Sequence, residues 1–190
     1  REQRQFFDKR LEVARQEHWS LALNNQPAWA AYMPIFEQAA KSSGLFWQNI
    51  AYSVCPVAAY KTPEELYEHI HDSHELRYRV NKLINQKKAL FEILTDGSDL
   101  ERWVDEFCEA HVLRWKDTDT PSAYRNAKRR EFLKGCLKAW ADEGILVRFS
   151  VKVEGARVGF VVGLLEKHAL VHHSTTYHPA FSKYSPGKAL

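Results

Sequence analysis

Residues 158–165 read VGFVVGLL, a run of apolar residues and glycine without a single charge. A short run that is apolar on both faces is typical of the central strand of a sheet. Before it, residues 154–155 (Glu-Gly) predict a tight turn that follows an alternating strand at 145–153. After it, residues 167–168 predict a second turn, and a third strand follows at 169–177. The region therefore predicts three antiparallel strands joined by short turns.

Two helices are expected before this meander. Residues 100–115 and 124–143 each place apolar residues three and four positions apart, and Gly144 follows the second helix. A strand at 89–94 and a turn at 96–99 that caps the next helix precede them. The sequence thus predicts an α+β fold, with helices packed on a mostly antiparallel sheet.

The first part of the chain is expected to be mainly helical. Helical spacing covers residues 3–23, and a second helix is expected from Pro27 to Gly44, with Pro34 kinking or shortening it. A strand is expected at 45–54 (LFWQNIAYSV). A capping box at 62–65 (Thr-Pro-Glu-Glu) opens a further helix to about residue 83, with a break near Asp72-Ser73.

Composition excludes several classes of protein. The 190 residues include 27 Lys and Arg against 24 Asp and Glu, a net charge of +3. This excess suits an anionic ligand, but it is far from the dense basic surface of a nucleic-acid-binding protein. No apolar run reaches the ~18 residues that span a bilayer. The cysteines Cys55, Cys108 and Cys136 are odd in number and far apart, which favours a reducing cytoplasm over a disulfide framework.

The last six residues, SPGKAL, are the most informative for function. Ser185 as N-cap, Pro186 in the first turn and Gly187 after it predict the start of a helix, whose free amides and dipole favour phosphate. Lys188 adds a cation. An ordinary Ser-Pro-Gly turn is the alternative. Because the chain begins at Arg1 and stops inside this first turn, we expect it to be part of a longer protein, with its fold truncated at the C-terminus.

The order of strand, two helices, three-stranded meander and phosphate-binding helix resembles the GNAT acyltransferase fold. More specifically, FCEAHVLRW at 107–115, PSAY at 121–124 and the Ser-Pro-Gly segment resemble the CelD/BcsL-type acetyltransferases of cellulose biosynthesis. The basic helix at 71–85 resembles the linker of that family, and the match covers about 27–190. The resemblance implies transfer of an acetyl or other acyl group from acyl-CoA to an amine or hydroxyl of a polysaccharide or envelope precursor. It also implies association with the envelope or polysaccharide-synthesis machinery.

That family carries two GNAT-like units in tandem, as the FemAB-type peptidyl transferases do. The resemblance implies the end of a first unit at 1–60, a helical linker at 61–88 and an incomplete second unit at 89–190. Two other functions stay open. One is a FemAB-like transferase that uses aminoacyl-tRNA, which the modest charge of +3 disfavours. The other is a non-catalytic GNAT-like binding module.

The resemblance also implies a site. Acceptors in this fold attack the thioester directly, so the protein positions both groups and accepts a proton. Backbone amides of the third meander strand would bind the pantetheine and the thioester oxygen, and imidazoles beside them suit a general base. Strand alternation directs only one of two neighbouring histidines to a given face, and both being ordinary strand residues is the alternative. The residues implied are His172, His173 and Tyr177 for catalysis; Ser174, Thr175, Ser185, Pro186, Gly187 and Lys188 for acyl-CoA; and Arg114 and Trp115 for the acceptor.

No metal site is expected. His69, His71 and His74 are the nearest approach to a ligand cluster, but their spacing does not place them on one helical face.

Overall fold

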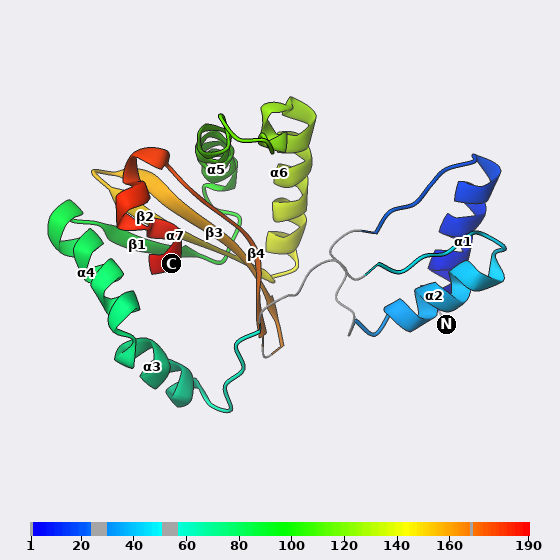
Figure 1. The fold of residues 1–190 in the computed structure, drawn as a ribbon, viewed down its shortest axis with the longest axis horizontal. Helices are drawn as coiled ribbons and strands as arrows, with labels where there is room; N and C mark the ends of the chain where they lie inside the picture. The colour runs from blue at the N-terminus through cyan, green and yellow to red at the C-terminus, as the bar shows by residue number, and fades with distance from the viewer. Residues whose placement is uncertain (1, 24–29, 51–56, 168) are drawn as a thin grey trace. The chain divides into compact units, whose positions relative to one another are not determined.

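The computed structural model describes residues 2–23, 30–50, 57–167 and 169–190, which divide into two compact units, 1–59 and 60–190 (Figure 1). The first unit contains helix α1 (Glu2–Gln16) and helix α2 (Met33–Ser42). Leu11, Phe36, Ala39 and Ala40 form its small buried core.

Three expectations for this unit need correction. The second helix begins at Met33 rather than near Pro27, since residues 30–32 are not helical, and residues 27–29 lie outside the described residues. Pro34 stands in the first turn of this helix, where a missing N–H is tolerated. The first helix ends at Gln16 rather than near residue 23, since His18 adopts a left-handed conformation with φ of 56°. The strand expected at 45–54 is wrong for residues 45–50, which are irregular, while residues 51–54 lie outside the described residues. The reason is that Trp47 packs edge-on against Phe36 of α2, at 5.2 Å between ring centres, so this aromatic stretch covers a helix instead of joining a sheet.

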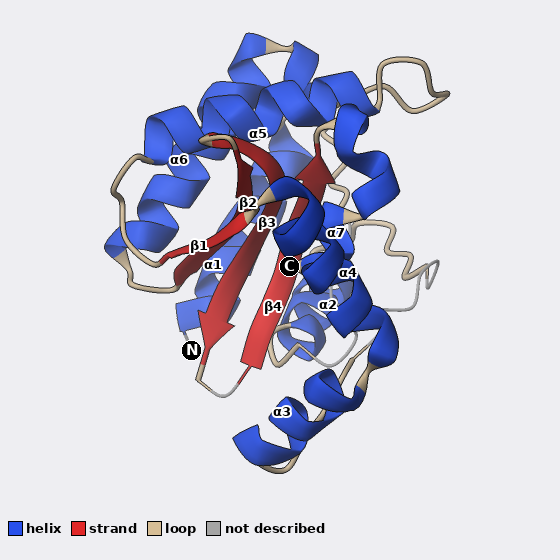
Figure 2. Cartoon of the chain, turned by 90° about the vertical axis from the view of Figure 1, so that its left-hand side faces the viewer, coloured by secondary structure: helices blue, strands red, loops and turns tan. Residues whose placement is uncertain are grey.

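The second unit is built on one four-stranded antiparallel sheet with the strand order β1-β2-β3-β4 (Figure 2). The α+β architecture and the three-stranded meander are therefore confirmed. The strands are β1 (Leu90–Leu94), β2 (Leu146–Val153), β3 (Ala156–Glu166) and β4 (Ala169–Tyr177). The helices are α3 (Pro63–Asp72), α4 (His74–Lys87), α5 (Leu100–Arg114), α6 (Ala127–Asp142) and α7 (Pro186–Ala189), with 3-10 turns η1 (Ala123–Arg125) and η2 (Pro179–Tyr184).

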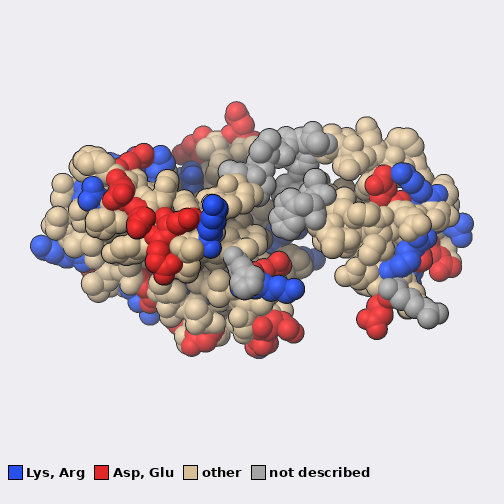
Figure 3. All heavy atoms as spheres, turned by 90° about the horizontal axis from the view of Figure 1, so that it is seen from below, with Lys and Arg blue, Asp and Glu red and all other residues tan. Residues whose placement is uncertain are grey.

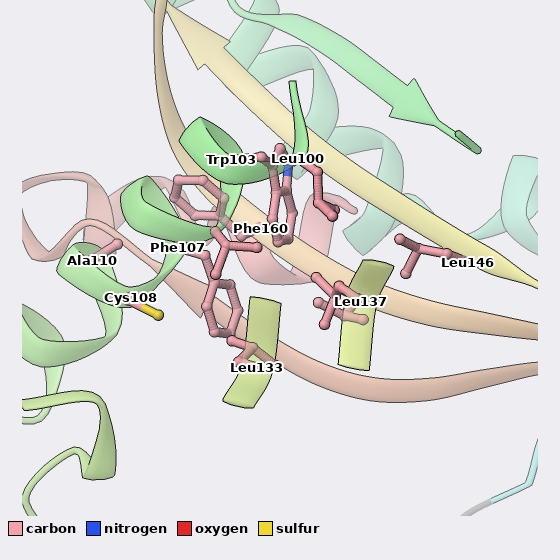
Figure 4. Close-up of a cluster of buried hydrophobic side chains, with 11 residues drawn as sticks. Leu100, Trp103, Phe107, Cys108, Ala110, Leu133, Leu137, Leu146 and Phe160 are labelled. Carbon is pink, nitrogen blue, oxygen red and sulfur yellow. The ribbon is translucent and has the colours of Figure 1, made fainter. Parts of the chain in front are cut away.

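Helices α5 and α6 cover one face of the sheet and enclose the larger core (Figure 4). Trp103 and Phe107 of α5 are fully buried, and Phe160 of β3 meets both rings edge-on. The indole Nε1 of Trp103 donates a hydrogen bond of 2.7 Å to Ser150 Oγ on β2, which satisfies the only polar atom of that side chain.

Helices α4 and α7 cover the opposite face of the sheet (Figure 1). Side chains of neighbouring strand residues alternate between the two faces, so this face also receives apolar side chains that a helix can bury. Their core is smaller. Its buried members are Leu83, Ala89, Val151, Val153, Val158 and Tyr184. Leu83 is the buried residue of α4, so this helix packs directly on the domain that contains the sheet.

Side-chain caps begin both α3 and α4, and the cap of α4 lies at the predicted break between the two helices. Thr62 Oγ1 accepts a 3.2 Å hydrogen bond from the amide of Glu65, and Ser73 Oγ accepts one from the amide of Leu76. The Glu65 carboxylate bonds the amide of Lys61, one residue before the position expected for a capping box.

The turn at 96–99 is held differently from the expected helix cap. Asp99 occupies the N-cap position with φ of 51° and makes no side-chain cap. Its carboxylate instead accepts a 2.7 Å hydrogen bond from Arg157, which also binds Glu92 and Glu106. Arg157 thereby joins β3, β1 and the start of α5.

Candidate active site

The open edge of β4 is where the predicted residues meet. Arg114, at the end of α5, donates a 3.4 Å hydrogen bond from Nη1 to the carbonyl oxygen of Thr175. Its guanidinium lies 4.3 Å from the ring centre of Tyr177, a cation–π contact. The Thr175 carbonyl therefore points away from β3. Because the N–H and C=O of one strand residue project to the same side, the Thr175 amide also faces the open edge.

Helix α7 lies against this edge on the α4 side of the sheet. Pro186 is buried over Gly159 of β3, where an added Cβ would stand 2.8 Å from the proline Cβ. A Cβ on Gly187 would lie 3.2 Å from Thr175 Oγ1 and 3.7 Å from Tyr177 Cδ1. The absence of side chains at both glycines lets α7 pack closely onto β3 and β4.

Ser185 holds α7 in another way than predicted. The residue occupies the N-cap position, but its φ of 50° is left-handed and its hydroxyl makes no cap. Ser185 Oγ instead accepts a 2.7 Å hydrogen bond from Arg79 of α4. Arg79 is itself paired with Glu75 at 2.7 Å, and Lys188 approaches the same carboxylate at 3.5 Å. The hydrogen bond from Arg79 lowers the pKa of Glu75, and the charge of Lys188 adds to this effect.

The start of α7 presents a free amide. The proline at 186 has no N–H, and the Gly187 amide makes no hydrogen bond to any residue that the structure describes. An unpaired amide on a backbone without a side chain, beside the cations of Arg79 and Lys188, has the chemistry that a diphosphate needs.

A β-bulge separates the two predicted histidines. His172 pairs with Gly163 and Ser174 with Val162, so His173 is the extra residue on β4. The His173 ring meets Trp140 of α6 edge-on, with ring centres 5.1 Å apart. Desolvation beside α6, with a smaller effect from the charge of His172, lowers the pKa of His173, which favours its neutral form. Both histidine side chains still reach solvent. The bulge is thus the local feature that places one imidazole against α6.

Sequence reasoning missed one hydrogen bond near Arg114. His111 Nδ1 lies 2.8 Å from Ser122 Oγ, so the loop after α5 is fastened back to this helix. Burial, followed by the charge of Arg114, lowers the pKa of His111. Trp115 stacks on His111 at 6.0 Å and is half-buried. The PSAY segment at 121–124 supplies this serine, which is 5% exposed, an unusual burial for a polar loop residue that only the structure reveals.

The structure brings Arg114, Thr175, Tyr177 and Gly187 into one cluster at the edge of β4. His173 contacts α6, and Lys188 points to Glu75. Neither Glu75 nor Arg79 was singled out in the sequence. Their helix was expected to be a linker, although it supplies the side chains that hold Ser185.

Comparison with known families identifies the second unit. The acetyltransferase (GNAT) domain model matches residues 72–190, well over half of the chain. The chain belongs to the GNAT acetyltransferase family. No curated protein matches the chain. The GNAT domain thus includes α4, the whole sheet and α7. The expectation of an acyltransferase is confirmed at the level of the family.

In the ranges given above, no group of three His, Cys, Asp or Glu side chains is placed to hold a metal ion. Burial raises the pKa of the Cys108 thiol to about 11, so this cysteine is a core residue rather than a nucleophile. Within the same ranges, no helix is long and apolar enough to cross a membrane.

Proposed function

We propose that this GNAT domain transfers an acyl group from acetyl-CoA or another acyl-CoA to an amine or hydroxyl acceptor. The observation that carries the proposal is the cluster of Arg114, Thr175, Tyr177 and Gly187 at the open edge of β4. We further propose that the acceptor is a polysaccharide or envelope precursor, as in the CelD/BcsL-type enzymes, and that the reaction takes place in the cytoplasm. In the same proposal, residues 1–60 are the end of a first GNAT-like unit.

The donor would be held by backbone and by charge. The free Gly187 amide would bind the diphosphate, with Lys188 and Ser185 beside it. The Thr175 amide at the open edge, next to Ser174, would hydrogen-bond the pantetheine arm. Arg114, already bonded to the Thr175 carbonyl, would fix the local conformation of this edge.

The acceptor must lose a proton as it attacks the thioester. His173 is the base that we propose first, because its ring is held against Trp140 of α6 and its lowered pKa favours the neutral imidazole that can accept a proton. His172 and Tyr177 stay alternatives. Arg114 and Trp115 would line the acceptor side, since they lie at the end of the helix that His111 joins to the loop at 116–122. Attack is direct, so the residues position both substrates and move a proton.

The first test is binding of acetyl-CoA to the intact protein, measured by titration calorimetry and as a rise in melting temperature. Gly187→Val is expected to weaken binding by at least about tenfold, because its side chain fills the space before Thr175 and blocks the amide. The matched control is Gly135→Val, which adds the same side chain in open space on α6. The melting temperature of each variant without ligand separates lost binding from lost folding.

Three outcomes would contradict the proposal. Binding that survives Gly187→Val unchanged removes the diphosphate site. A melting temperature raised by aminoacyl-tRNA and not by acetyl-CoA would favour a FemAB-like donor. A protein that responds to neither would be a non-catalytic module.

A further inference from the structure

Three lysines surround one buried tyrosine on the α4 side of the sheet. The Nζ atoms of Lys82, Lys87 and Lys183 lie 5.5, 5.4 and 5.2 Å from the ring centre of Tyr184. Tyr184 itself is 6% exposed and belongs to the smaller core. Lys82 also donates a 3.2 Å hydrogen bond to the carbonyl oxygen of Lys183, which ties α4 to η2. The three ammonium groups, called here the Tyr184 lysine cluster, thus gather around one ring.

Within the described ranges, no carboxylate balances the Tyr184 lysine cluster. Among the residues that the structure describes, none of its lysines takes part in an ion pair, and Glu75 nearby is occupied by Arg79 and Lys188. Residues 74–88 and 178–190 together contain seven Lys and Arg against one acidic residue, whereas the whole chain has 27 against 24. Elsewhere the charges are mixed, and Figure 3 shows a face on which Asp and Glu lie among Lys and Arg.

Uncompensated like charges gathered around one ring repel one another, and a multivalent anion would relieve the repulsion. Lysine suits a compact anion, because its ammonium is a strongly hydrated point charge that binds from any direction. A phosphomonoester is such an anion, since its second pKa near 6 gives it close to two negative charges at pH 7. The cluster therefore fits a terminal phosphate rather than a carboxylate held by a planar arginine fork.

The cluster adjoins the segment to which the donor diphosphate was assigned. Lys183 lies four residues before Gly187, and Arg79, on the same helix as Lys82 and Lys87, binds Ser185. Coenzyme A carries a phosphomonoester on the ribose 3′ oxygen, one sugar away from its diphosphate. We propose that the Tyr184 lysine cluster binds this 3′-phosphate and so selects coenzyme A over its dephosphorylated form. The inference rests on the proposed function, because it assumes the diphosphate at Gly187.

The test compares two donors on the unaltered protein by titration calorimetry. CoA is expected to bind at least about tenfold more tightly than dephospho-CoA, which lacks only the 3′-phosphate. Adenosine 3′,5′-bisphosphate is expected to compete with CoA at lower concentration than ADP. Added salt should reduce the preference, because the cluster is partly exposed.

Variants then locate the preference. The triple variant Lys82→Met, Lys87→Met, Lys183→Met keeps the apolar stems that pack around Tyr184 and removes the charges. It should bind CoA and dephospho-CoA equally. The matched control is Lys128→Met on α6, an exposed lysine without an ion pair in the described part of the chain, and it should retain the full preference.

Each outcome decides between the two proposals. Equal affinity of the unaltered protein for CoA and dephospho-CoA overturns the 3′-phosphate site and leaves the proposed function intact. A preference for CoA that survives in the folded triple variant overturns the assignment to these lysines. Binding of neither donor overturns the proposed function, and the 3′-phosphate site with it. If the triple variant does not fold, the competition by adenosine 3′,5′-bisphosphate against ADP on the unaltered protein still decides whether the 3′-phosphate is recognised.

Discussion

The two faces of the sheet differ in the size and charge of the residues that line them. Under α5 and α6, the side chains are large, apolar and buried, and the charged residues at the rim neutralise each other through Arg157. Under α4 and α7, the core is smaller and glycines replace side chains at the closest contact. The lysines around Tyr184 have no acidic partner in the described part of the chain.

The difference separates stability from binding. Burial of large apolar side chains supplies most of the free energy of folding, so the α5 and α6 face should decide whether the domain folds. Free amides, close backbone approach and unpaired charge are unfavourable for folding alone, but they favour an anionic ligand. On this argument, changes to the two faces should move different measurements.

The largest effect is expected from Trp103→Ala. The indole is fully buried between Phe107 and Phe160, and its loss also leaves Ser150 without its partner. Removal of a buried aromatic side chain should lower the free energy of unfolding by about 3–5 kcal/mol, measured by urea denaturation. Phe132→Ala on α6 is the control, because that ring is 68% exposed. A loss below about 1 kcal/mol in Trp103→Ala would mean that this face is not the main core.

The second effect concerns acid stability on the same face. Burial by itself would raise the pKa of Glu92, but hydrogen bonds from Arg157 and Lys152 outweigh it and lower the pKa to about 2. The folded pKa thus lies below the ordinary value of 4.5, so this carboxylate stabilises the fold above pH 4.5 and the contribution is lost as the pH falls toward 2. Glu92→Gln should remove roughly 3 kcal/mol at pH 7 and progressively less below pH 4.5.

Urea denaturation across this pH range measures the effect of Glu92→Gln. Glu109→Gln is the control, since it removes an exposed carboxylate of α5 that has no ion pair among the described residues, and it should change stability by less than about 0.5 kcal/mol. A stability difference between Glu92→Gln and the unaltered protein that stayed constant from pH 7 to pH 3 would contradict the ion-pair account.

The sheet and its helices were predictable, because their signals are local and periodic. The apolar run of β3, the turn at Glu154 and the stripes of α5 and α6 each fix an element without information from elsewhere. The strand expected at 45–50 failed for the opposite reason. Its residues favour a strand locally, but Trp47 finds a tertiary partner in Phe36, and such a contact overrides propensity.

The candidate site was predictable only in part. Gly187 and Thr175 were found by motif and by resemblance, and the structure places them in contact distance of each other. The roles of Arg79 and Lys82 depend on how α4 packs on η2 and α7, across about 100 residues of sequence. No periodicity or motif reports a contact at that separation. The bulge at His173 was likewise invisible, because residues 172–176 (HHSTT) are all polar and offer no apolar alternation in which a shift of one position would show.

The smallest effect tests the closest contact of the α4 and α7 face, since it compares two glycines of the same strand. A Cβ on Gly159 would meet Pro186 Cβ at 2.8 Å, and one on Gly163 would meet Leu170 Cδ1 at the same distance. The proline ring is tied to the backbone of α7 and cannot rotate away, whereas Leu170 is 53% exposed and its side chain can move. Gly159→Ala should therefore displace α7, at about 1–2 kcal/mol of stability, while Gly163→Ala should be close to neutral.

The decisive readout for this pair is the affinity for acetyl-CoA beside the melting temperature. Displacement of α7 moves the Gly187 amide away from Thr175, so Gly159→Ala should weaken binding by more than its loss of stability alone would suggest. Gly163→Ala should bind normally. If both variants lost the same stability and neither lost affinity, the contact between Pro186 and Gly159 would be ordinary core packing, and the separation of a folding face from a binding face would fail at its closest point.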